Sequence, residues 1–168
     1  QTVKIGSQIW MASNLKVTKF RDGKAINFSI DPFNWNNMSQ FYGVYCNIND
    51  NPGNNTTYGR LYNWLAVSDA SKLAPVGWHI PSESEWETLR ANIGSFGSLM
   101  SVSGNWEDFS ETIDNSTGFS AEPGGFKDVS GYNEDFGRAA RFWSSTKAPQ
   151  EFKAHTFSIT DPSLAYYE

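Results

Sequence analysis

The stretch PSESEWETLRANIG, residues 81–94, contains the strongest local structural signal in this chain. Ser82 and Glu85 stand three residues apart and match a capping box, in which each side chain accepts a hydrogen bond from the backbone N–H of the other residue. Apolar side chains then recur at i, i+3 and i+7, beginning with Trp86, which is the spacing of one buried helix face. The stretch therefore predicts a helix over residues 83–93 with Trp86 in the core.

The rest of the chain predicts one more helix and several strands. Residues 59–67 cluster their apolar side chains at helical spacing and are expected to form a short buried helix. Residues 2–10 alternate around a Gly-Ser turn and predict a β-hairpin, and strands are expected at 141–146 and 154–159. We therefore predict a single α+β domain over residues 1–168, with two short helices packed on a small twisted antiparallel sheet and joined by long ordered loops.

The composition is typical of an extracellular recognition domain. Aromatic residues make up 15% of the 168 residues, charged residues make up 18%, and the net charge is −5. No basic stripe is present, so we expect no nucleic-acid partner. No apolar run reaches the roughly 20 residues that cross a bilayer, so we expect no transmembrane segment. Many rings and many Gly and Asn residues indicate a loop-rich fold with an aromatic core.

The single cysteine, Cys46, excludes a disulfide within this chain. We expect it to be a small buried residue. The alternative is a bridge to a segment or partner that lies outside this sequence.

Five motifs follow one another along the chain: VKIGSQIWMASNL at 3–15, YGRLYNW at 58–64, APVGWHIPS at 74–82, GFSAEPGG at 118–125 and FWSST at 142–146. In this order they resemble the Fibrobacter succinogenes major paralogous domain, which is typical of exported proteins and lipoproteins of Bacteroidota and Fibrobacter. We expect the aromatic residues within and beside these motifs to form the core: Trp10, Trp64, Trp78, Trp86, Phe119 and Trp143.

A more distant resemblance concerns the fold. WHIPS at 78–82, EW at 85–86 and WSS at 143–145 are similar to the arrangement in the formylglycine-generating, sulfatase-modifying family. That resemblance implies a C-type-lectin-like fold. Formylglycine-generating enzymes need a pair of active-site cysteines, which a chain with Cys46 alone does not supply. We therefore expect no enzymatic activity.

The chain departs from the family pattern in two places. Family members usually carry a cysteine before the Gly-Trp-His segment, where this chain has Ala74 and Pro75. They also usually end in a further strand, which this sequence does not reach. Three alternatives are open for the place of that strand: it follows in a longer chain, a segment with Leu164, Tyr166 and Tyr167 folds back into it, or a strand from another chain fills it.

Two tryptophans are candidate ligand-binding residues. Trp35 and Trp106 both stand in polar, Asn-rich or acidic surroundings. Exposed rings of this kind stack on sugar faces or anchor protein interfaces. The alternative is that both rings cover loops and belong to the structure.

A cluster of amide and carboxylate side chains is a candidate calcium site. Asn47, Asn49, Asp50 and Asn51 offer oxygen ligands, which calcium prefers, within a stretch that we expect to be a loop. The cluster has one carboxylate and does not match an EF-hand, and ordinary Asn turn chemistry explains it equally well.

Together these patterns predict a non-catalytic extracellular binding or adhesion domain whose ligand is a glycan or a protein. We expect it to be secreted or anchored at the bacterial outer membrane. The alternative is a structural or adhesive subunit of a larger cell-surface assembly.

Overall fold

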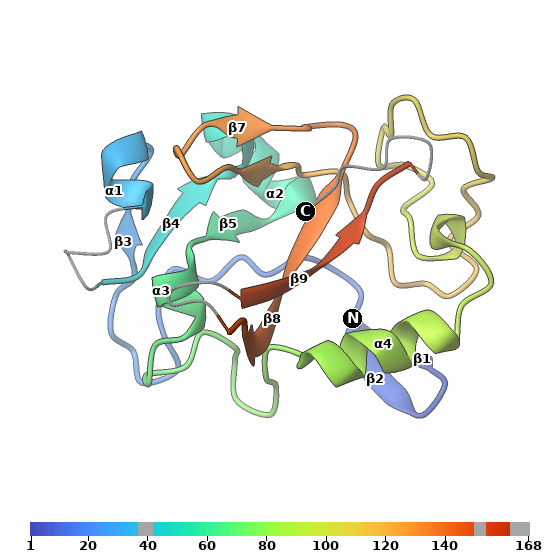
Figure 1. Ribbon diagram of the computed structural model, residues 1–168, viewed down its shortest axis with the longest axis horizontal. Helices are drawn as coiled ribbons and strands as arrows, with labels where there is room; N and C mark the ends of the chain where they lie inside the picture. The colour runs from blue at the N-terminus through green and yellow to red at the C-terminus, as the bar shows by residue number, and fades with distance from the viewer. Residues whose placement is uncertain (37–41, 150–153, 162–168) are drawn as a thin grey trace.

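The computed structural model of the protein describes residues 1–36, 42–149 and 154–161. A long hairpin of two strands crosses the middle of the molecule, with the longest helix below it and three smaller sheets around it (Figure 1). The strands are β1 (Thr2–Ile5), β2 (Gln8–Met11), β3 (Asn27–Phe28), β4 (Val44–Asn47), β5 (Arg60–Tyr62), β6 (Phe126–Lys127), β7 (Asn133–Glu134), β8 (Ala140–Lys147) and β9 (Ala154–Ile159). The helices are α1 (Pro32–Asn36), α2 (Asn55–Tyr58), α3 (Trp64–Val67) and α4 (Glu83–Ala91), with 3-10 turns at Ile48–Asp50, Pro52–Asn54 and Phe96–Ser98.

Helix α4 confirms the capping box. The Ser82 hydroxyl accepts from the Glu85 N–H at 3.3 Å, and the Glu85 carboxylate accepts from the Ser82 N–H at 2.8 Å. Trp86 and Leu89 point inward and are buried. The helix ends at Ala91, two residues before the predicted end, because the next residue leaves the helical region with φ near −104°.

The helix predicted over residues 59–67 is wrong in its first half. Residues Arg60–Tyr62 form strand β5, which pairs antiparallel with β4, and the helix α3 begins only at Trp64. Asn63 marks the change, since its side-chain oxygen accepts from the N–H of Ala66 in the helix and from the N–H of Val44 in the strand, each at 3.0 Å. Pairing with β4, distant in sequence, overrides the local helical spacing.

The mixture of helices and strands confirms the α+β class, but the single antiparallel sheet is wrong. The described residues form four small sheets, β1–β2, β3–β4–β5, β6–β7 and β8–β9, and β3 pairs with β4 in parallel. The strands predicted at 2–10, 141–146 and 154–159 are confirmed. Most of the described strands are two to four residues long, whereas β8 and β9 have eight and six residues.

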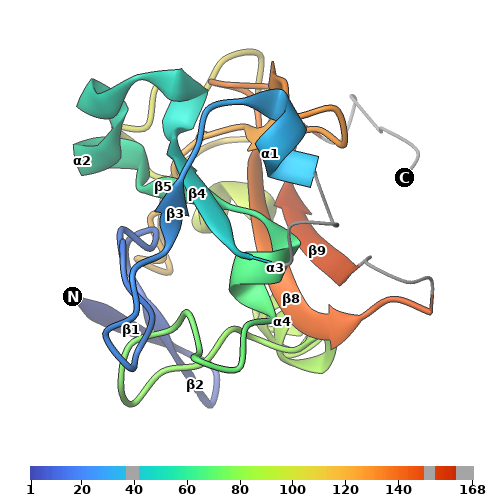
Figure 2. The same cartoon turned by 90° about the vertical axis from the view of Figure 1, so that its left-hand side faces the viewer.

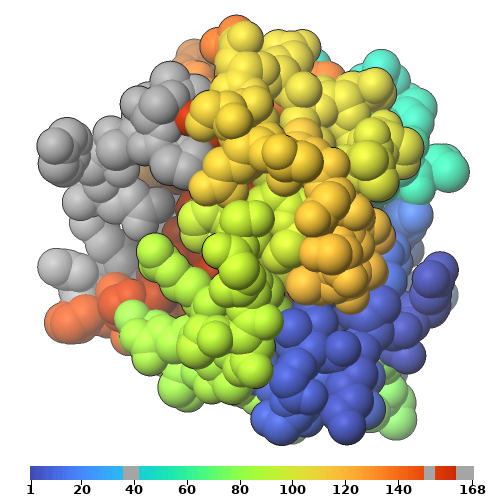
Figure 3. Space-filling model, turned by 90° about the vertical axis from the view of Figure 1, so that its right-hand side faces the viewer, coloured from blue at the N-terminus to red at the C-terminus, as the bar shows by residue number. Residues whose placement is uncertain are grey.

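Loops complete the fold on one side. Figure 3 shows the loop residues around 110–125 lying beside the N-terminal hairpin and above α4. Gly118 is so close to β1 that a Cβ there would approach the Val3 side chain at 3.0 Å. Gly125, in the fourth motif, has a φ of +65°, and a Cβ on it would meet the Glu134 carbonyl at 2.3 Å. The Pro-Gly-Gly segment is therefore a structural bend that needs glycine.

Aromatic rings form the main core, as expected. Trp10, Trp86 and Phe119 are buried, whereas Trp64 and Trp143 are half-buried against a second cluster. Trp78 is half-buried and belongs to none of the core clusters of the described residues, so the prediction that it lies in the core is wrong. The predicted segment with Leu164, Tyr166 and Tyr167 lies outside the described residues.

Candidate functional site

The first predicted ligand-binding residue, Trp35, is buried rather than exposed. Its exposed fraction is 8%, and it packs with Val44 and Cys46 of β4. The Lys127 ammonium lies 5.9 Å from the centre of its ring. Trp35 is therefore a core residue of α1, which supports the structural alternative.

The predicted calcium segment is folded rather than a loop. Its side chains are used within the protein: the Asn47 amide oxygen accepts from Asn55 and Arg60 at 2.8 and 3.0 Å, and the Asn51 side chain accepts from the Gly53 N–H. Asn49 stands in a 3-10 turn with a φ of +50°.

Asp50, the carboxylate of that segment, already has a cationic partner. The Lys127 ammonium lies 3.2 Å from it, and the Asn133 amide donates to it at 2.6 Å. The Lys127 side chain is 1% exposed and also donates to the Gly131 carbonyl. Because this ammonium neutralises Asp50 and repels a second cation, it weighs against calcium here. Calcium remains a prediction, which melting with and without a chelator decides.

The second predicted ligand-binding residue, Trp106, is half-buried. Its ring packs against the main core and against Phe109 at 5.9 Å. Its indole N–H is buried and has no partner among the described residues, and the same holds for one carboxylate oxygen of Glu122. These two atoms lie 3.0 and 2.8 Å from the position that a Cβ on Gly104 would take. A side chain at 104 would therefore require the Glu122 and Trp106 side chains to shift.

A cleft of about 460 Å³ is lined by residues from many parts of the described chain. Its walls include three strands of different sheets, β2, β5 and β8, together with residues of other elements such as α4 and β6. In the view of Figure 2, β2 lies below β5 and β8. The tryptophan, tyrosine and phenylalanine rings on the cleft wall are those of Trp10, Trp35, Tyr58, Tyr62, Trp78, Trp86, Phe119, Phe126, Phe142 and Trp143. Apolar walls with few polar groups are typical of ligand pockets.

The ionisable groups at the cleft have different surroundings. Burial raises the pKa of Glu122, and the nearby Ser101 hydroxyl and Lys16 charge offset this only in part. Burial also raises the pKa of Glu85, but the Ser82 backbone N–H and a hydrogen bond with His79 reverse that effect, so its pKa lies below the ordinary value. The Nε2 atom of His79 is 2.8 Å from the Glu85 carboxylate, so the imidazole lies beside the start of α4.

We expect Glu122→Gln to stabilise the fold at pH 7. A carboxyl whose pKa is raised in the folded state contributes to stability while it is protonated, and this contribution is complete below its unfolded pKa of about 4. The contribution to stability is lost as the pH rises through the raised pKa of the folded state. The glutamine amide of the variant does not ionise, so the variant does not lose stability in this way. The melting temperature measured from pH 4 to pH 8 checks the prediction: the variant should gain on the natural protein as the pH rises. An equal or lower melting temperature at pH 7 would contradict it.

Cys46 is fully buried in β4, and burial raises the pKa of its thiol to about 12. A thiol with this pKa is protonated and unreactive at neutral pH. The expectation of a small buried cysteine is confirmed.

The five motifs meet at the cleft. Each of them contributes residues to its wall: Trp10 from the first, Tyr62 from the second, Trp78 from the third, Phe119 from the fourth and Trp143 from the fifth. Residues 3–165 match the family described as the Fibrobacter succinogenes major domain. The chain belongs to this family. No curated protein and no solved structure matches this chain.

The cleft wall includes Trp35, the first predicted ligand-binding residue, whereas Trp106 is not among the residues that line it. Gln8 and Glu122 are polar residues of the cleft wall that were not predicted as site residues. The sequence signal that could have found Gln8 is its place inside the first motif. None of the described helices is long and apolar enough to cross a membrane.

Proposed function

We propose that this domain is a non-catalytic extracellular binding or adhesion domain, and that its ligand occupies the cleft between β2, β5 and β8. The observation that carries the proposal is the cleft itself, with a volume of about 460 Å³ and walls of tryptophan and phenylalanine. Large rings give much of the binding energy at recognition sites for glycans and for proteins.

The proposal includes a location and a fold. We place the domain outside the cell, secreted or anchored at the bacterial outer membrane, because its family is typical of exported proteins and lipoproteins. We also place it with C-type-lectin-like folds, on the strength of the WHIPS segment at 78–82 and the WSS segment at 143–145. The Ser145 N–H donates to the Pro81 carbonyl at 2.7 Å, so these two segments are in contact, which supports that placement.

A blocking variant tests the proposed function. Ser13 is exposed at the cleft wall, and Ser13→Trp would place a bulky ring over it. Ser116 is exposed away from the cleft, so Ser116→Trp is the matched control. Ligands are selected on a glycan array and on a peptide array with the natural protein. We expect Ser13→Trp to weaken their binding at least tenfold and Ser116→Trp to leave it unchanged. Equal binding by both variants, or no ligand on either array, would contradict the proposal.

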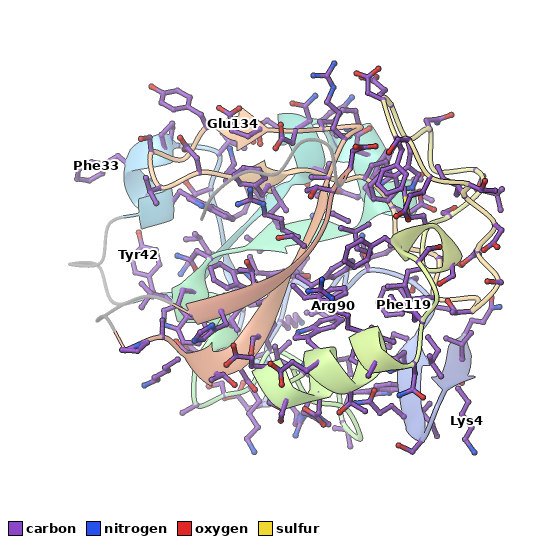
Figure 4. The ribbon with its side chains drawn as sticks, turned by 45° about the vertical axis from the view of Figure 1, so that its right-hand side comes forward. Lys4, Phe33, Tyr42, Arg90, Phe119 and Glu134 are labelled. Carbon is purple, nitrogen blue, oxygen red and sulfur yellow. The ribbon has the colours of Figure 1, made fainter. Side chains whose placement is uncertain are left out.

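A second candidate function is a structural or adhesive subunit of a larger surface assembly. Exposed apolar side chains of β3, α1, the segment between them and the β6–β7 turn favour it: Phe28, Ile30, Phe33, Val129 and Tyr132. The turn lies against α1, since a Cβ on Gly131 would meet the Pro32 backbone at 2.5 Å. The Phe33 ring projects away from α1 into solvent (Figure 4). Such a patch is typical of protein contact sites. If it mediates assembly, Phe33→Glu should abolish a complex recovered from native membranes while leaving cleft binding intact.

A further inference from the structure

Strand β2 presents its edge to the cleft. All four residues of Gln8–Met11 line the cleft. Successive side chains of a strand point to opposite faces, so a space bordered by four consecutive residues runs along the edge of the strand or around it. Strand β2 pairs with β1 on its other side and with no further strand among the described residues.

The hydrogen-bond pattern of the hairpin shows which backbone groups face outward. The Ala12 N–H donates to the Gln1 carbonyl at 3.2 Å, and the register pairs Thr2 with Met11 and Lys4 with Ile9. Hydrogen-bonded and non-hydrogen-bonded pairs alternate along an antiparallel ladder. The N–H and C=O groups of Ile9 and Met11 therefore point away from β1, and they have no hydrogen-bond partner in the described part of the chain.

The side chains between these outward groups also lack partners. The Gln8 amide oxygen and the Trp10 indole N–H are both buried without a hydrogen bond among the described residues. Glu122, which lines the same cleft, has a buried carboxylate oxygen that also lacks a hydrogen bond among the described residues. Buried polar groups in native proteins are nearly always hydrogen-bonded. Strand β2 therefore has unused hydrogen-bonding groups on each of its four residues.

The edges of the other two strands are already partly covered. In β5, the Arg60 N–H donates to the Leu15 carbonyl at 3.1 Å, and the Tyr62 carbonyl accepts from the Trp143 indole at 2.7 Å. In β8, the Trp143 carbonyl accepts from the Trp86 indole at 3.3 Å. These strands supply mainly apolar walls, so β2 is the edge that remains for pairing.

We propose that the cleft binds an extended polypeptide segment of a partner protein, which pairs with β2 as an added strand. This inference rests on the proposed function and names the ligand class. A strand brings backbone donors and acceptors for Ile9 and Met11, and it brings apolar side chains for the tryptophan walls. A sugar lacks those side chains, and an acyl chain lacks the donors and acceptors. The edge of four residues suits a segment of about five to seven residues with alternating apolar side chains.

The test uses synthetic peptides and one backbone-selective variant. The probes are nine-residue peptides in which valine or leucine alternates with threonine or lysine, together with the same peptides N-methylated at alternate residues. Ile9 is 64% exposed and its N–H points outward, so Ile9→Pro removes the pairing donor while the β1–β2 hydrogen bonds remain. Ile9→Thr changes the same side chain but retains the donor.

We expect members of the peptide set to bind the natural protein, with affinity at least tenfold lower for Ile9→Pro and within twofold for Ile9→Thr. N-methylation that removes the donors facing β2 should lower affinity for the natural protein at least tenfold, which tests pairing without any variant. Equal binding by Ile9→Pro, equal binding of the N-methylated peptides, or no peptide binding would overturn the inference. If saccharides bind instead of peptides and Ser13→Trp blocks their binding, the proposed function stands and the strand-pairing inference fails. If neither class binds, both fail.

Discussion

Trp86→Ala is expected to lower the free energy of unfolding by about 3–5 kcal/mol, the usual cost of removing a buried large ring. Trp86 is 6% exposed and stacks on Phe157, with ring centres 4.7 Å apart and planes 1° apart. It also contacts Trp10 at 4.7 Å and Phe142 at 5.6 Å. Its ring therefore joins α4 to β9, β2 and β8. Urea denaturation followed by circular dichroism measures the change.

Trp86→Phe is the matched control for this prediction. It keeps an aromatic ring in the stack and removes the indole N–H that donates to the Trp143 carbonyl at 3.3 Å. We expect it to lose clearly less stability than Trp86→Ala, because a neutral hydrogen bond contributes about 1 kcal/mol. If Trp86→Ala cost less than about 1 kcal/mol, the ring would not be the centre of the core.

Lys127→Met is expected to cost about 3 kcal/mol, at the low end for breaking a buried ion pair because Asp50 remains partly exposed. The methionine fills much of the same volume but leaves Asp50 without its cation and the Gly131 carbonyl without a donor. It also removes the charge beside the Trp35 ring. Thermal denaturation at pH 7 measures this loss.

The double variant Lys127→Met with Asp50→Asn separates the charge from the packing. Replacing both members of an ion pair leaves no unpaired charge, so the double variant should recover part of the lost stability. A double variant whose loss equals the sum of the two single losses would mean that the pair has no coupling.

The elements that the sequence predicted well depend on neighbours in sequence. The α4 capping box joins residues three apart, and the β1–β2 hairpin closes through a two-residue turn. Strand β5 was missed because its partner, β4, is brought to it by a fold that local spacing does not encode.

The candidate site was less predictable for the same reason. Trp35 stands among polar residues in sequence, yet residues of β4 bury its ring and Lys127 lies beside it. Asp50 looked like a calcium ligand because its partners, Lys127 and Asn133, are 77 and 83 residues away. All five motifs contribute residues to the cleft wall. The motifs taken together therefore indicate the position of the cleft, whereas no single residue type indicates it.

Amide hydrogen exchange along β2 tests the central claim most directly. The protein is measured alone and with a saturating ligand selected on the arrays, and the exchange rates of Ile9 and Met11 are compared with those of Phe28 and Phe33 in the exposed patch. The account predicts that the ligand slows exchange at Ile9 and Met11 and leaves the patch unchanged. Protection of the patch with unchanged exchange along β2 would contradict it and would place the binding surface on α1 and β3.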